Sequence, residues 1–154
     1  MARKYVLDTS LYVRAFRSIE AAAELERFYT NFTPAIYLSS VVLHELLAGS
    51  NSPRKRRDIE EKIARPLNRV ARLITPSHAA WEDAGILLSR MSLKEKLDLK
   101  RAPKSLVLDL LLASSCKEAG VILITENLKD FGRIRGYTSF EFTEPWPGLR
   151  TKGA

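Results

Sequence analysis

The sequence is poor in the residues that form covalent crosslinks or soft metal sites. Among its 154 residues there is one cysteine, Cys116, and there are two histidines, His44 and His78. One cysteine excludes an internal disulfide and a Cys-based zinc site, and two histidines do not make a cluster of nitrogen ligands. Any metal that this chain binds should therefore have oxygen ligands, which favours Mg²⁺ or Mn²⁺.

Long apolar runs are absent as well. No segment approaches the roughly 20 consecutive apolar residues that a membrane span requires. The residues before Asp8 include Arg3 and Lys4 but no apolar stretch of the kind found in a signal sequence. We therefore expect a cytoplasmic protein with no membrane partner.

The composition is that of one folded domain with a basic surface. Hydrophobic residues make up 45% of the chain, which is enough for one domain with a substantial core but not for two. We expect this domain to span residues 1–144, with residues 145–154 as a C-terminal tail. Lysine and arginine total 25 against 18 acidic residues, a formal charge of +7, and this surplus favours a polyanionic partner such as nucleic acid.

Short β-type runs alternate with longer helical patterns along the chain. This alternation is typical of an α/β fold in which helices cover a parallel sheet. We expect strands near residues 4–8, 35–39, 71–75, 121–125 and 138–142, and helical segments near 10–31, 40–49, 53–71, 77–92 and 104–119. Ser39 or Ser40 and Ser77 stand where N-caps belong, and Gly49 and Gly120 where C-caps belong.

Three carboxylates stand in unusually apolar surroundings. Asp8 ends the first predicted strand, Glu45 lies in the helical segment 41–49, and Asp109 follows Leu106, Val107 and Leu108 in another helix. A lone buried acid costs several kcal/mol unless it is protonated or paired. Each acid alone could pair with a nearby Lys or Arg, but a cation shared by all three explains the set more economically.

A fourth group of polar residues follows the strand near 121–125. The segment Thr125-Glu126-Asn127-Leu128-Lys129-Asp130-Phe131 should lie at the carboxyl end of that strand, on the same sheet edge as Asp8. This edge is where open α/β sheets bind their ligands.

Together these motifs resemble the PIN domain family, and within it the VapC-type toxins of type II toxin–antitoxin pairs. The resemblance is carried by Asp8-Thr9-Ser10 after a strand, a Ser-Ser-x-x-x-x-Glu helix ending at Gly49, Asp109 in a helix that closes with Ala119-Gly120, and Ile124-Thr125-x-Asn127-x-x-Asp130-Phe131. It covers about residues 4 to 143. It implies a three-layer α/β/α fold with a parallel sheet of about five strands.

The resemblance also implies a function and a set of site residues. It implies a Mg²⁺-dependent endoribonuclease toxin, with Mn²⁺ as a substitute, that cleaves RNA such as tRNA or rRNA, forms a homodimer and is neutralised by a VapB-like antitoxin. Asp8 and Asp109 match the principal metal ligands and Glu45 the second acid. Asn127 occupies the fourth position, and Asp130 either supplies charge there or caps the following helix. The basic segments 54–57 and 94–104 are candidates for contacting the RNA backbone.

Other classes of protein fit less well. A HAD-type phosphatase needs a second Asp two residues after the first, and position 10 is Ser. A dinucleotide-binding Rossmann domain needs glycines after its first strand, and Asp8-Thr9-Ser10-Leu11 has none. The alternative that stays open is a PIN-like module that binds RNA or protein without cleaving, for which Asn127 in place of a fourth acid is the main argument.

Overall fold

The structure is a computed structural model that describes residues 2–149, and it contains one parallel sheet. Its five strands are β1 (Tyr5–Leu7), β2 (Ile36–Ser39), β3 (Leu73–Ile74), β4 (Ile122–Ile124) and β5 (Phe142–Thr143). They lie in the order β3-β2-β1-β4-β5, and every neighbouring pair is parallel. The predicted α/β class with a five-stranded parallel sheet is confirmed.

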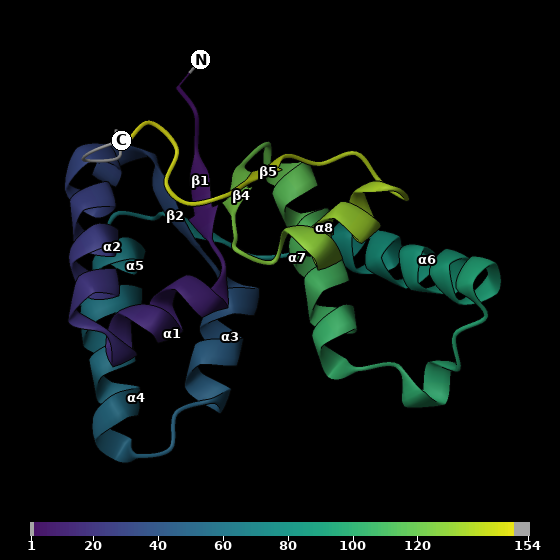
Figure 1. Cartoon of the computed structure of the whole chain (residues 1–154), viewed down its shortest axis with the longest axis horizontal. Helices are drawn as coiled ribbons and strands as arrows, with labels where there is room; N and C mark the ends of the chain where they lie inside the picture. Colours follow the sequence, from purple (N-terminus) through teal and green to yellow (C-terminus); the bar gives the residue numbers. More distant parts are fainter. Residues whose placement is uncertain (1, 150–154) are drawn as a thin grey trace.

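Helices cover both faces of this sheet (Figure 1). One face carries α1 (Thr9–Arg17), α2 (Ile19–Phe32), α3 (Ser40–Ala48), α4 (Pro53–Ile59) and α5 (Arg65–Arg69). The other carries α6 (His78–Glu95), α7 (Lys104–Ala119) and α8 (Leu128–Arg135). Short 3₁₀ segments at Thr33–Ala35 and Leu99–Arg101 and a π-helical turn at Glu60–Ala64 complete the helical structure in the described part of the chain.

The strand order creates a switch point between β1 and β4. From β1 the chain moves outward to β2 and β3, then returns to β4 on the other side of β1 and continues to β5. The connections after β1 and β4 therefore leave the sheet toward opposite faces, which is the topology at which open α/β sheets bind ligands. Asp8 follows β1 directly and Thr125 follows β4 directly, so both residues lie at this switch point.

Local sequence signals set the helix boundaries. Ser39 caps α3 by accepting a hydrogen bond from the Val41 N–H (3.1 Å), and Ser77 caps α6 by accepting one from the Ala80 N–H (3.2 Å). Gly120 ends α7 with φ of +65°, a left-handed conformation that glycine adopts at low cost. The predicted caps at these sites are confirmed.

Helix α7 passes through the centre of the domain. Its residues 110–116 are all buried, including those on the sides that would face solvent in a surface helix. Burial on all sides agrees with the sequence of α7, in which apolar residues are spread around the helix instead of lying along one side. Asp109 stands immediately before this buried stretch, so the packed helix fixes the position of its backbone.

Three boundaries differ from the sequence prediction. The expected helix over 53–71 is divided, with a π-helical turn between α4 and α5. The last strand is Phe142–Thr143 rather than 138–142, because its register is set by pairing of Phe142 with Leu123 and Thr143 with Ile124. Helix α8 lies outside the predicted helical ranges, and the sequence suggests no more than a short helix near Phe131, because only Phe131 and Ile134 of its eight residues are buried.

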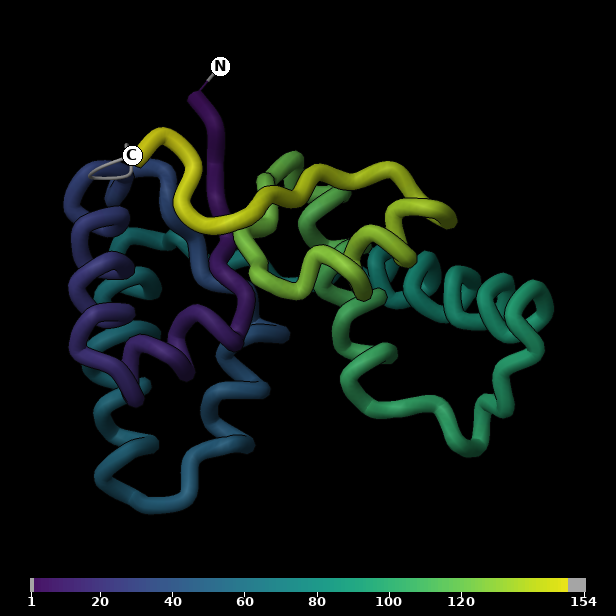
Figure 2. The backbone as a smooth tube through the Cα atoms, viewed as in Figure 1, coloured from purple at the N-terminus to yellow at the C-terminus, as the bar shows by residue number. Residues whose placement is uncertain are grey.

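The segment after β5 packs back onto the domain. The tube in Figure 2 runs from β5 across the sheet toward α2. There the Trp146 ring stacks on Phe28, with centroids 5.0 Å apart, and Phe28 stacks in turn on Phe32 at 4.8 Å. Residues 145–149 of the expected C-terminal tail therefore lie against the domain, whereas residues 150–154 are outside the described part of the chain.

Candidate active site

Asp8 is the most buried of the candidate acids, with 8% of its surface exposed. Its Oδ1 accepts a hydrogen bond from the Thr9 N–H (2.8 Å), which caps α1, and its Oδ2 accepts one from the Thr125 hydroxyl (2.8 Å). Burial raises the pKa of Asp8, while the Thr125 and Thr9 hydrogen bonds act in the opposite direction. The Asp8 carboxylate is thus held in one orientation by donors that follow β1 and β4, two strands that are adjacent in the sheet but distant in sequence.

Glu45 reaches the same region from α3. Its Oε1 accepts a hydrogen bond from the Thr9 hydroxyl (3.1 Å), which connects it to the residue that follows Asp8. Burial raises the pKa of Glu45, and the negative charge of Asp8 raises it further. The half-buried Glu45 carboxylate therefore lies close enough to Asp8 for the two charges to repel each other.

Asp109 is the most strongly perturbed acid in the group. Burial on α7 raises its pKa from the ordinary 3.8 to about 7, with further contributions from the charges of Asp8, Glu45 and Asp130. In the part of the chain that the structure describes, none of these four carboxylates forms an ion pair with Lys, Arg or His. Four acids from separate parts of the sequence therefore share one region, and none of them is neutralised by an ion pair with a described basic side chain.

Asn127 and Asp130 have different roles. Asn127 is the N-cap of α8: its Oδ1 accepts from the Asp130 N–H (3.4 Å), and its Nδ2 donates to Asp130 Oδ2 (2.9 Å). The hypothesis that Asp130 caps the helix is therefore wrong, because Asn127 does so. Asp130 stands in the first turn of α8. The Asn127 amide positions its carboxylate, whose charge helps to raise the pKa of Asp109.

The arrangement has the chemistry of a hard-metal site but not its closed geometry. Within residues 2–149 no group of three or more acidic, histidine or cysteine side chains is arranged to hold a metal ion as it stands. Like charges repel, so neighbouring carboxylates stand apart when no proton or cation lies between them. The donors are oxygen atoms only and carry excess negative charge, which fits Mg²⁺ or Mn²⁺.

Thr125 is the site residue that the sequence analysis did not single out. Besides donating to Asp8, its hydroxyl oxygen accepts a hydrogen bond from the Asn127 N–H (3.0 Å). One buried side chain therefore joins the β1 end of the site to the start of α8. The available signal was a hydroxyl residue directly after a buried strand at the predicted ligand edge.

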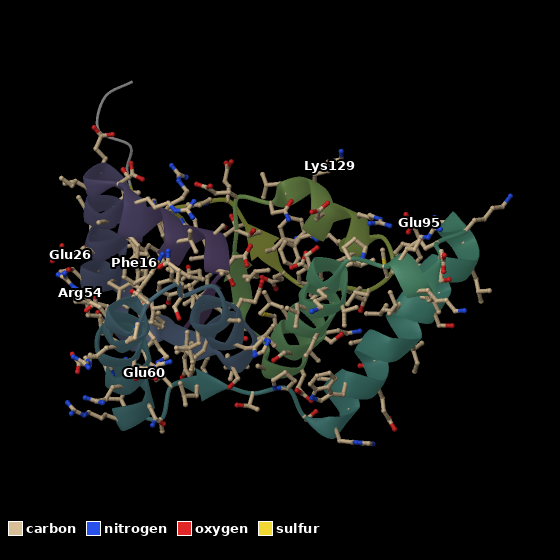
Figure 3. All side chains as sticks on the ribbon, turned by 90° about the horizontal axis from the view of Figure 1, so that it is seen from below. Phe16, Glu26, Arg54, Glu60, Glu95 and Lys129 are labelled. Atoms are coloured by element: carbon tan, nitrogen blue, oxygen red, sulfur yellow. The ribbon has the colours of Figure 1, made fainter. Side chains whose placement is uncertain are left out.

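A pocket of about 450 Å³ opens beside Asp109 and Asp130. The segment between α6 and α7 forms its other side, with Lys96, Arg101 and apolar residues such as Leu97 and Pro103. The two basic segments noted in the sequence are thus separated: Arg54 of α4 and Glu95 of α6 lie at opposite ends of the molecule (Figure 3). Only the segment between α6 and α7 lines the pocket that contains the acids.

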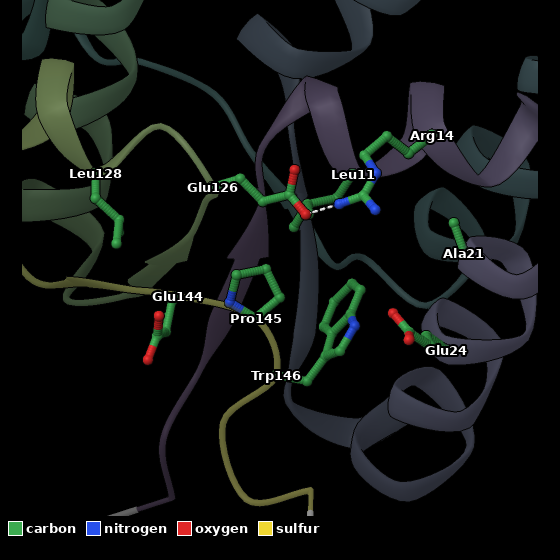
Figure 4. A pocket seen from close by; sticks show the side chains of 9 residues that line it. All are labelled: Leu11, Arg14, Ala21, Glu24, Glu126, Leu128, Glu144, Pro145 and Trp146. Atoms are coloured by element: carbon green, nitrogen blue, oxygen red, sulfur yellow. Dashed lines mark hydrogen bonds and ion pairs between the residues drawn. The ribbon is translucent and has the colours of Figure 1, made fainter. Parts of the chain in front are cut away.

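A second pocket, of about 310 Å³, lies between the first two helices and the C-terminal segment (Figure 4). An ion pair between Arg14 of α1 and Glu126 spans one side of it, and Trp146 stands opposite. Glu24 and Glu144 also line it. Its polar side chains are therefore three carboxylates and one guanidinium.

The first helices expose less apolar surface than their sequence suggested. The sequence predicts an apolar surface on the first helices, because Leu11, Tyr12, Phe16, Leu25 and Phe28 exceed what one core-facing stripe needs. Leu11, Tyr12 and Phe28, however, are buried. Leu25 is half-buried, and Phe16, 38% exposed, is the most accessible of the five. These side chains are buried because α1 packs against α2 and α3, and because Phe28 lies between Tyr5 of β1 and Trp146. An extended apolar surface on these helices was a wrong prediction.

The fold and the site define an α/β protein with clustered carboxylates at the carboxyl edge of a parallel sheet. The model of the PIN domain family matches residues 5–137. The chain therefore belongs to the PIN domain family. It matches none of the curated proteins compared with it.

Several solved structures share this architecture. A chain of DNA-bound VapBC from Salmonella typhimurium has a TM-score of 0.68 at 17% identity, with 93% of this chain and 98% of that chain covered. VapBC2 from Rickettsia felis, bound to a DNA fragment from its promoter, gives 0.59 at 25% identity, covering 92% and 98%. VapBC-1 from nontypeable Haemophilus influenzae gives 0.59 at 20% identity, covering 91% and 96%. Nearly the whole chain therefore has the fold found in these complexes.

Proposed function

We propose that this protein is a metal-dependent endoribonuclease toxin whose activity is suppressed by a cognate antitoxin. The observation that carries the proposal is the gathering of Asp8, Glu45, Asp109 and Asp130 in one region without an ion pair to any basic side chain within residues 2–149. A structural role would favour pairing each acid with Lys or Arg, which are in excess in this sequence. Burial and the charges of the neighbouring acids raise the pKa of Asp109 to about 7, as expected for a carboxylate that forms no ion pair with a described basic side chain.

Asp8, Asp109 and Glu45 are the residues that would hold Mg²⁺, with Mn²⁺ as a substitute. When bound, the ion supplies charge neutralisation at a phosphodiester and lowers the pKa of a bound water. The protein's own residues orient the carboxylates. Thr125 and the Thr9 N–H fix Asp8, the Thr9 hydroxyl fixes Glu45, and the Asn127 amide holds Asp130. Preorganised ligands of this kind avoid an ordering cost when the metal and the substrate bind.

The polyanionic substrate is supported by the positive charge of the chain. A formal charge of +7 raises the local concentration of nucleic acid around a site whose own acids would repel phosphate. We propose RNA as the substrate, with tRNA and rRNA as the classes to test first, and a cytoplasmic location. None of the helices within residues 2–149 is long and apolar enough to cross a membrane.

A VapB-like antitoxin is the proposed partner. Support comes from the solved relatives, which are VapBC complexes, and from the pocket between α1, α2 and the C-terminal segment. The carboxylates of Glu24, Glu126 and Glu144 around the Trp146 ring would suit a segment with basic and apolar side chains. We also propose a homodimer, supported by Ile86 and Leu93, which are exposed on one side of α6.

The decisive experiment is cleavage of RNA by the purified chain. We expect cleavage with Mg²⁺ or Mn²⁺, none in excess EDTA, and a loss of at least about 100-fold for Asp109→Asn. Asp83→Asn, a carboxylate exposed on α6, is the matched control and should retain full activity. Expression of the wild-type chain should arrest growth, and co-expression of the neighbouring antitoxin should relieve the arrest.

The alternative is a PIN-like module that binds without cleaving. It becomes the better account if the purified wild-type chain binds RNA but leaves it intact with either metal and if its expression is harmless. Because the Asn127 side chain is engaged in capping α8, its amide does not by itself indicate an inactive site.

A further inference from the structure

The pocket beside Asp109 and Asp130 combines two kinds of surface that the carboxylate site alone does not need. Its acidic side belongs to α7 and α8, whereas its opposite side comes from the link between α6 and α7. That link contributes the cations Lys96 and Arg101 and an apolar wall. The wall consists of Leu97, Ala102, Pro103 and Leu106.

We propose that this pocket is a substrate subsite, in which Lys96 and Arg101 bind a phosphate of the RNA strand next to the scissile bond and the apolar wall receives the adjoining nucleoside. The proposal rests on the proposed ribonuclease function and assigns the place where the strand leaves the acidic centre. The volume of about 450 Å³ lies in the range of pockets that hold small organic groups. Basic side chains beside Asp109 and Asp130 would reduce the repulsion between these carboxylates and an RNA backbone.

The two cations differ from the third basic residue of the pocket in their availability. Arg133 donates to Glu95 (2.8 Å), and the same carboxylate accepts from the Tyr137 hydroxyl (2.8 Å), so Arg133 is held and partly neutralised. Lys96 has no ion pair among the described residues. Arg101 has only the exposed Asp98 at 3.6 Å, and its own side chain is 89% exposed. Lys96 and Arg101 are therefore the groups free to bind phosphate.

The backbone at Lys96 supports this assignment. Lys96 ends α6 with φ of +55°, a left-handed conformation in which glycine is the usual residue. Within the described chain only one other non-glycine residue, Ala71, has a positive φ. A lysine at this position places a charge at the pocket at the expense of backbone stability, a pattern found at functional sites.

Because Lys96 brings a charge to the pocket but strains the backbone, one substitution can separate its effect on RNA binding from its effect on stability. Lys96→Gly removes the charge but relieves the backbone, so its melting temperature should rise while its RNA affinity falls. With Arg101→Gln added, we expect KM for a short RNA to rise about tenfold and kcat to stay within twofold. The slope of log affinity against log salt should become shallower by about 0.7, which corresponds to one lost phosphate contact on a single strand.

The control removes the same charge and relieves the same backbone strain at a remote place. The variant R65Q/R69Q/A71G alters two exposed arginines of α5 and the other left-handed residue. Its KM and salt slope should match those of the wild type. Affinity should be measured in the Asp109→Asn background by fluorescence anisotropy, which needs no turnover, and R101Q alone serves if the double variant does not fold.

The outcomes distinguish the two proposals. Wild-type cleavage together with unchanged KM and salt slope in K96G/R101Q overturns the subsite but leaves the ribonuclease proposal intact. Equal losses in the α5 control also overturn it, because the effect would then come from net charge alone. A wild-type chain that neither binds nor cleaves RNA overturns both proposals.

Discussion

Thr125 donates a 2.8 Å hydrogen bond to Asp8 across the boundary between β4 and β1. The two residues are 117 positions apart in sequence, and both are buried. Asp8 follows β1 and Thr125 follows β4, and these two adjacent strands border the switch point of the sheet. Together with the hydrogen bond from the Thr9 N–H, this contact fixes the orientation of the carboxylate around which Glu45 and Asp109 gather.

Loss of that contact should be costly. In Thr125→Val, the side-chain shape is kept but Asp8 Oδ2 loses its donor, and we expect unfolding free energy to fall by about 1–3 kcal/mol. The pKa of Asp8 should rise further, because the Thr125 hydrogen bond lowers it. Chemical denaturation and metal-dependent cleavage measure the two effects. Thr125→Ser, which keeps the hydroxyl, should retain most of both; equal damage in the Ser variant would contradict the role of the hydroxyl.

The raised pKa of Asp109 predicts a stability that depends on pH. The folded state binds this proton up to about pH 7, whereas the unfolded chain releases it near pH 3.8. The contribution of Asp109 to stability should therefore be greatest at low pH and be lost as the pH rises from about 4 to about 7. A rise of this size corresponds to at most about 4 kcal/mol, and about 1–2 kcal/mol remains once solvent screening of the partly exposed group is allowed for.

Asp109→Asn should abolish the loss of stability that deprotonation of Asp109 causes. In EDTA at pH 8 the variant should be more stable than the wild type by about 1–2 kcal/mol, and the difference should vanish near pH 4. Thermal melts across this pH range provide the measurement. Asp83→Asn should leave the pH profile unchanged. If the Asp109→Asn variant is instead less stable than the wild type at pH 8, the acid is compensated by a partner.

Asn127 and Asp130 should separate into a structural and a metal-linked role. Asn127→Ala removes the N-cap of α8 and should cost about 1 kcal/mol. Asp130→Asn leaves that cap in place, so its unfolding free energy should stay within about 0.5 kcal/mol, while the Mg²⁺ concentration needed for half-maximal activity should rise several-fold. A Mg²⁺ titration decides the second point. An unchanged titration would restrict the metal-linked set to Asp8, Glu45 and Asp109.

The proposed homodimer has a defined surface to test. Ile86 is 57% exposed and Leu93 is 80% exposed, and a spacing of seven residues places them on one side of α6. The double change to Glu should convert a dimer to a monomer of 17.4 kDa with little loss of stability, because neither side chain is buried in the single chain. Light scattering after size exclusion measures the mass. Ile19→Glu, at an exposed position on α2, should leave the dimer intact; a monomeric wild type would refute the proposal.

Much of the fold followed from local pattern. The apolar run before Asp8, the serine caps at positions 39 and 77 and the glycine after α7 each signal their element through interactions within a few residues. Helix α8 did not, because it is short and buries only Phe131 and Ile134. The last strand was displaced because a two-residue strand is defined by its partner rather than by its own sequence.

The amino-acid sequence was enough to identify the acids whose burial needs an explanation. Asp8, Glu45 and Asp109 stand in apolar segments, and the cost of burying a charge is a property of the residue type and its neighbours along the chain. The hydrogen bonds and the surroundings of these acids, by contrast, became visible only in the tertiary structure. The Thr125 bond to Asp8, the burial of Leu11, Tyr12 and Phe28, and the meeting of Lys96 with Asp109 in one pocket all join distant segments. Contacts of this kind depend on the strand order and on helix packing, which no local pattern encodes.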